Sequence, residues 1–189
     1  PRVRARWLFW LGANQMHADQ RAEAERTWAR AQDSADAASW RWLRFHLERT
    51  SIRPVIEDGR YEEARGRIEA LRPWVNHALP LDLADYHHLR GWLALVTGDA
   101  RVARQHYELA VESARRGALP DRIASMYRAG LAISLVAAGD EDAAEGIIEE
   151  LEFLPGPRGL ALRAANLALV RACRSRRLGA EDYEQRLAE

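Results

Sequence analysis

Apolar residues recur at spacings of three and four along most of the chain, which is typical of amphipathic helices. In one stretch the pattern runs through Leu89, Trp92 and Val96, stops at a short polar break, and resumes through Val102 and Tyr107. No segment alternates with period two through β-branched residues, so a sheet is not expected. The pattern predicts an all-α chain in which two antiparallel helices form one repeating unit.

Glycines mark the breaks between the two helices of a unit. Gly59, Gly98, Gly139 and Gly179 are spaced by 39, 41 and 40 residues. Glycine adopts positive φ at little cost and is favoured just past a helix C-terminus, so each of these residues predicts a helical hairpin. We therefore expect one domain over residues 1–189, built from helix pairs at about 3–36, 38–77, 80–117, 120–153 and 157–188.

Two of these pairs resemble the tetratricopeptide repeat. In that motif a small residue late in the first helix lets the helices approach closely, and two alanines and an aromatic residue follow at fixed spacing in the second helix. The matching residues are Gly12, Ala24, Trp28 and Ala31 in the first pair, and Gly91, Ala103, Tyr107 and Ala110 in the third. The resemblance implies a right-handed α-solenoid with a concave face lined by the first helix of each pair.

The period of about 40 exceeds the 34 residues of an ordinary tetratricopeptide repeat. Such longer helices are similar to those in the sensor superhelix of bacterial LuxR-type signal-transduction ATPases, the MalT-like transcription regulators. This resemblance implies a cytoplasmic, non-catalytic sensor module that binds a small effector or a protein partner in its groove. The alternative is a stand-alone scaffold or adaptor that docks a peptide or protein.

Projection of the third pair onto the others names the residues expected in the groove. Guanidinium groups bind carboxylate or phosphate, and an aromatic ring stacks on a ligand or packs against its apolar part, so one stripe on the second pair fits an anionic ligand. The alternative for the stripe is that its arginines are solvated or paired and its tryptophan lies in the core. The candidate residues are Trp42, His46, Arg49 and Arg53 in the second pair, and Asp85, His88 and Trp92 in the third.

Charge is balanced overall but segregated locally. The chain carries 28 basic and 28 acidic residues, so no global field draws it to nucleic acid or to an anionic membrane, and we expect direct binding to neither. The segment 140–152 is acidic, whereas 158–177 is basic. The two segments either pair internally or dock a partner, and exposed ends of the array favour self-association.

Motifs for catalysis, cofactors and metals are missing. We find no glycine-rich phosphate loop, nucleophile elbow or His-Glu-x-x-His pair, so we expect neither an enzyme nor a cofactor. Asp85 and His88 share a helical face, but two ligands do not make a metal site. The single cysteine, Cys173, fits a reduced cytoplasmic setting, and no apolar run reaches the length of a membrane span. The start at Pro1 without Met suggests a fragment of a longer protein.

Tryptophan is unusually frequent. On helices of this periodicity we expect most of these residues to be packing residues, with Trp92 the exception because it falls in the predicted groove. The seven are Trp7, Trp10, Trp28, Trp40, Trp42, Trp74 and Trp92.

Overall fold

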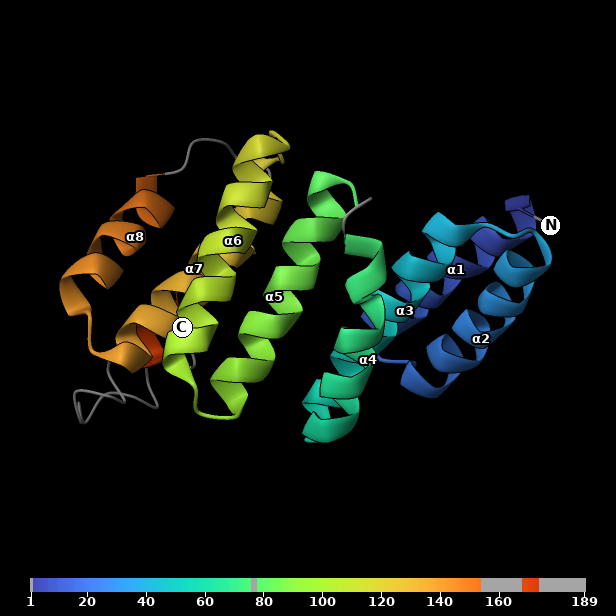
Figure 1. Ribbon diagram of the computed structural model, residues 1–189, viewed down its shortest axis with the longest axis horizontal. Helices are drawn as coiled ribbons and strands as arrows, with labels where there is room; N and C mark the ends of the chain where they lie inside the picture. The colour runs from blue at the N-terminus through green and yellow to red at the C-terminus, as the bar shows by residue number, and fades with distance from the viewer. Residues whose placement is uncertain (1, 76–77, 154–167, 174–189) are drawn as a thin grey trace. The chain divides into compact units, whose positions relative to one another are not determined.

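The computed structural model describes residues 2–75, 78–153 and 168–173 (Figure 1). The described residues form helices and no strand, which confirms the predicted all-α helical-repeat fold. The helices are α1 (Arg2–His17), α2 (Arg21–Ala37), α3 (Arg41–Glu57), α4 (Tyr61–Val75), α5 (Pro80–Val96), α6 (Ala100–Arg116), α7 (Asp121–Ala138) and α8 (Glu141–Phe153). Residues 168–173 are also helical, whereas the rest of the predicted pair 157–188, with Gly179, lies outside the described residues.

A residue with positive φ ends the first helix of each of the four described pairs. Gly59, Gly98 and Gly139 have φ values of 73°, 85° and 89°, as the hairpin prediction requires. In the first pair Asp19 takes this place with φ 59°, which an Asp tolerates better than most residues. The four residues are spaced by 40, 39 and 41, so the repeat has the same register in all four pairs.

Aromatic side chains fill the space that small residues leave between paired helices. A Cβ built on Gly91 of α5 would lie 2.8 Å from the ring of Tyr107 in α6. A Cβ on Gly12 of α1 would lie 2.4 Å from the indole of Trp28 in α2, which donates a hydrogen bond of 3.2 Å to the carbonyl of Phe9. The small-to-aromatic packing predicted for the first and third pairs is therefore present.

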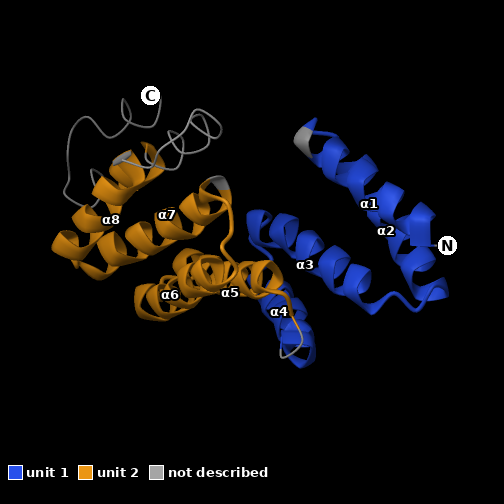
Figure 2. Cartoon of the chain, turned by 90° about the horizontal axis from the view of Figure 1, so that it is seen from above, with its two compact units in different colours: residues 1–76 blue, residues 77–189 orange. Residues whose placement is uncertain are grey.

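The chain divides into two compact units, residues 1–76 and residues 77–189 (Figure 2). In unit 1, Leu43 and Leu47 of α3 are buried against Trp28 of α2 and Phe9 of α1. Apolar residues are buried between the two helices of one pair, and also where one pair packs on the next, as α2 does on α3. In unit 2 the corresponding cluster contains Ala84, Ala110, Ala114, Ala124 and Tyr127.

Four of the seven tryptophans are buried or partly buried, as expected for most of them. Trp28 is buried and Trp40, Trp74 and Trp92 are partly buried. Trp7 and Trp10 are not packed, at 70% and 58% exposed, and Trp42, which is also a groove candidate, is 42% exposed. Helical periodicity places a residue on an apolar face, but it does not say whether another element covers that face.

Candidate functional site: a charged pocket in unit 1

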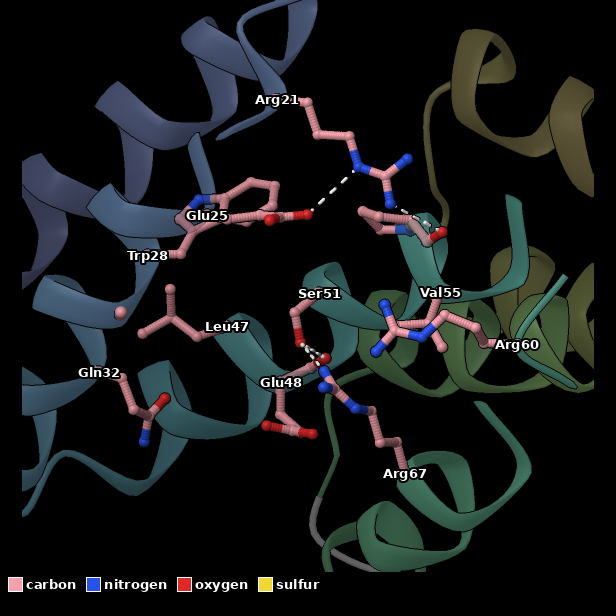
Figure 3. Close-up of a pocket in the computed structure, with 12 residues that line it drawn as sticks. Arg21, Glu25, Trp28, Gln32, Leu47, Glu48, Ser51, Val55, Arg60 and Arg67 are labelled. Atoms are coloured by element: carbon pink, nitrogen blue, oxygen red, sulfur yellow. Dashed lines mark hydrogen bonds and ion pairs between the residues drawn. The ribbon is translucent and has the colours of Figure 1, made fainter. Parts of the chain in front are cut away.

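A cavity of about 390 Å³ lies within unit 1, between α2, α3 and the start of α4 (Figure 3). Trp28 of α2 and Leu47 and Val55 of α3 form its apolar wall. Charged groups surround the rest of the opening, from three arginines and two glutamates. These are Arg21, Glu25, Glu48, Arg60 and Arg67.

The turn at Gly59 explains why residues of the next helix reach this cavity. The backbone reverses there with φ 73°, so Arg60 follows at once and Arg67 comes two helical turns later on α4. On α3, Leu47, Ser51 and Val55 are four residues apart and therefore share one face. The pocket is thus a direct product of the repeat geometry.

Arg21 is held in place by acidic neighbours on two helices. Its guanidinium donates to both carboxylate oxygens of Asp58, at 2.8 and 2.6 Å, and to the carbonyl of Pro54 at 3.1 Å. Its Nε donates to Glu25 at 3.2 Å. These hydrogen bonds lower the pKa of Asp58 below its usual value and raise that of Arg21. With two carboxylates on one guanidinium, Arg21 ties α2 to the end of α3.

Arg60 and Arg67 instead share one carboxylate. Glu63 accepts from Nε of Arg60 at 2.8 Å and lies 2.8 Å from Nη2 of Arg67. The hydrogen bond from Arg60 is the main cause of the lowered pKa of Glu63. Arg67 also donates to the neutral hydroxyl of Ser51 at 3.4 Å, as the dashed line in Figure 3 shows. Arg60 also lies 3.6 Å from Asp58, so two guanidinium groups face two carboxylates here. The corner offers N–H donors in a fixed arrangement rather than an excess of positive charge.

The predicted stripe on α3 lies on another face of the same helix. At 3.6 residues per turn, Trp42, His46, Arg49 and Arg53 point roughly 170° away from the pocket face of α3. The Trp42 and His46 rings stack with centroids 5.0 Å apart, and Nη2 of Arg49 lies 3.0 and 3.1 Å from the two ring nitrogens of His46. Arg53 pairs with Glu57 at 2.9 Å. The structure connects the first three side chains, and their role in binding stays a prediction.

The other three predicted residues lie on α5 in unit 2. Asp85 accepts a hydrogen bond of 2.5 Å from the hydroxyl of Tyr127. The ring of His88 lies among those of Trp92, Tyr107 and Tyr127, with centroids 6.2, 5.6 and 5.7 Å away. Asp85, His88 and Trp92 therefore belong to a packed polar and aromatic cluster between α5, α6 and α7, and their binding role stays a prediction.

The sequence did not indicate a histidine pair in the same unit. Nδ1 of His87 on α5 lies 3.2 Å from Nδ1 of His106 on α6, and the rings stack with centroids 5.4 Å apart. Burial, with the positive charge of Arg90 nearby, lowers the pKa of both histidines to about 4. Nothing in the sequence pairs two residues 19 positions apart, because only the angle between the helices decides which faces meet.

The acidic segment 140–152 pairs with arginines inside the protein at three described positions. Asp140 binds Arg104 at 3.0 Å, Glu150 lies 3.8 Å from Arg128, and Glu152 pairs with Arg171. Most of the basic segment 158–177 lies outside the described residues. Within the described part, the partners come from α6 and α7 as well as from the basic segment.

Metal, membrane and family comparisons add no further assignment. Over the described ranges, no group of three or more His, Cys, Asp or Glu side chains is placed to hold a metal ion. None of the helices in those ranges is long and apolar enough to cross a membrane. Comparison with known protein families, with curated proteins and with solved structures finds no match.

Proposed function

We propose that this chain is a non-catalytic binding module and that the unit 1 pocket holds a small ligand with an anionic group on an apolar body. The observation that carries the proposal is the set of three arginines, Arg21, Arg60 and Arg67, which line one cavity together with an apolar wall of Trp28 and Leu47. Guanidinium groups bind carboxylate and phosphate with directed, charge-assisted hydrogen bonds. An apolar wall removes the remainder of such a ligand from water.

The chemistry of the pocket favours binding over catalysis. The described lining residues contribute guanidinium, carboxylate, amide and hydroxyl groups, and neither His nor Cys is among them. The Ser51 hydroxyl donates to the backbone carbonyl of Glu48 at 2.8 Å, so it is not hydrogen-bonded to a general base.

The resemblance to MalT-like LuxR-type regulators gives this binding a role. In that role the module is a cytoplasmic sensor, and the effector biases the whole regulator between resting and active arrangements. Alternatively the chain is a scaffold of the tetratricopeptide type, and the same groups receive an acidic peptide.

A ligand screen with matched variants tests the site. The purified chain is screened by thermal shift against sugar phosphates, nucleotides, amino acids and acyl metabolites, and affinities are measured by calorimetry. Arg67→Gln should weaken an anionic ligand about tenfold or more, because it removes a charged hydrogen bond. Arg65→Gln is the control, since Arg65 lies on α4 and pairs with Glu62 at 3.5 Å without lining the pocket.

Each outcome separates the alternatives. Loss of binding in Arg67→Gln but not in Arg65→Gln supports the pocket. Loss only in the double variant Arg49→Ala, Arg53→Ala would move the ligand to the predicted stripe of α3. Stabilisation by acidic peptides alone would favour the scaffold over the sensor.

A further inference from the structure

The outward face of α1 carries the largest group of exposed apolar side chains on any described helix. Val3, Trp7, Trp10 and Leu11 are 65%, 70%, 58% and 48% exposed. Their spacing places all four on one side of the helix, away from Ala5, Leu8, Phe9 and Gly12, which face the core of unit 1. Two tryptophans in such a stripe represent apolar area that monomeric proteins rarely leave in water.

The register of the repeat shows what this face does elsewhere in the chain. Residues 40 positions after the α1 stripe fall on α3, and residues 120 positions after it fall on α7. Trp7 thereby corresponds to Leu47 and to Tyr127, which are 3% and 0% exposed. The full correspondence is Leu43, Leu47, Thr50 and Ser51 on α3, and Ile123, Tyr127, Gly130 and Leu131 on α7.

In both cases the preceding helix pair covers this face. Leu47 is buried in the cluster that holds Ala31 and Ala35 of α2, and Tyr127 is buried in the cluster that holds Ala110 and Ala114 of α6. In each pair the first alanine stands 12 positions and the second 16 positions after the residue with positive φ of the same repeat, which is Asp19 or Gly98. The covering element thus has one recurring form, a second helix with alanines four residues apart.

We infer that the α1 stripe is a docking surface for a further helix pair of this same repeat type, whose second helix presents two alanines four residues apart to Trp7. The charge of α1 adds a requirement on the partner helix. α1 carries Arg2, Arg4 and Arg6, all exposed, and no acidic residue. Arg4 corresponds in register to Arg44 of α3, which pairs with Asp36 of α2 at 2.7 Å, so the partner helix carries an acidic residue at that position. Two copies of α1 packed on each other would instead bring like charges together. This inference is independent of the unit 1 pocket.

The test supplies this partner in register. The full chain is extended at its N-terminus by a second copy of its own residues 2–40, so that the added α2 meets α1 as α2 meets α3. Amide hydrogen exchange in α1 should slow by about tenfold or more relative to the unextended chain, because the covered helix opens less often.

Two variants show which face is responsible. Trp7→Glu with Trp10→Glu, made in the original α1 and not in the added copy, should abolish the added protection in the extended chain. The same changes should leave the unextended chain folded, since both side chains are exposed. Leu109→Glu, at an exposed apolar residue of α6, should leave the added protection intact. Unchanged exchange in the extended chain, or protection that survives both Trp→Glu changes, would overturn the inference.

A second measurement covers an extended chain that does not fold. The ¹⁵N-labelled full chain is titrated with the unlabelled peptide 2–40, and the indole N–H signals of Trp7 and Trp10 should shift while that of buried Trp28 stays in place. Absence of a shift with a peptide that is helical by circular dichroism contradicts the inference. So does a dimer of the unextended chain that Trp7→Glu dissociates, because the occupant would then be a second copy.

Discussion

Gly130 is the position at which the packing of unit 2 leaves the least room. A Cβ built there would lie 2.0 Å from Cε1 and 2.4 Å from Cζ of Tyr107, well inside van der Waals contact. The ring has little room to retreat, because the α5 backbone at Gly91 lies so close to its other edge that a Cβ built there would be 2.8 Å from the ring. Tyr107 is therefore held between α5 and α7 by two glycines, and Gly130→Ala should force the helices apart.

The expected loss follows from two opposing effects. Ala is the better helix former by about 1 kcal/mol, which would stabilise α7 if the space were open. Overpacking of a rigid buried ring costs about 1–3 kcal/mol, and more where the backbone must move. The built Cβ of Gly130 lies 2.0 Å from the Tyr107 ring, more than 1 Å closer than ordinary van der Waals contact. We expect a net destabilisation of about 2 kcal/mol and a fall of about 4–8 °C in Tm.

Urea titration followed by far-ultraviolet circular dichroism measures the effect, with hydrogen exchange in α6 to assign it to unit 2. Gly146→Ala on α8 is the matched control, because nothing lies within 4 Å of its built Cβ, and it should stabilise by about 0.5–1 kcal/mol. In a Tyr107→Leu background, the cost of Gly130→Ala should shrink. If Gly130→Ala proves as stable as Gly146→Ala, Tyr107 is not clamped as described.

Three further changes test other features. Between pH 7 and 4.5 the chain should lose roughly 1–2 kcal/mol of stability in urea titrations. The reason is that the unfolded state binds protons at His87 and His106 below pH 6.5, whereas the folded pKa values are about 4. In His106→Gln the free energy of unfolding should change less with pH. Gly98→Ala should cost about 1 kcal/mol in thermal unfolding because φ is 85° there, and an unchanged Tm would contradict that backbone conformation. Asp58→Asn should lower stability at neutral pH by removing the charged partner of Arg21, and high salt should reduce the difference between the two proteins.

The helices and their turns followed from local rules. Gly59, Gly98 and Gly139 identified their hairpins because only a few residue types tolerate positive φ. Asp19 was not identified, because Asp is also common in ordinary helices and loops and so does not by itself indicate a turn. The closeness of Gly12 to Trp28 and of Gly91 to Tyr107 also followed, since both members of each contact belong to one repeat whose spacing is visible in the chain.

The candidate site was less accessible from the sequence. The stripe from Trp42 to Arg53 was chosen correctly as one face of α3, but the cavity opens on the opposite face, against α2 and the start of α4. Arg21 and Arg60 attracted no attention in the sequence because neither belongs to a local cluster. Arg21 reaches the cavity because α2 packs beside the end of α3, and Arg60 reaches it because the turn at Gly59 brings α4 beside α3.

The sequence by itself determined the class of fold, the length of the repeat and the residues that hold each helix pair together, because backbone conformation and close packing within a repeat depend on nearby residues. Only the tertiary structure decided which faces are covered, which charges meet and where a cavity remains. Trp7, Leu47 and Tyr127 occupy one register position, yet the first is exposed and the other two are buried. Burial depends on the neighbour that packs there, and that neighbour is set by contacts between helices rather than by the pattern along one helix.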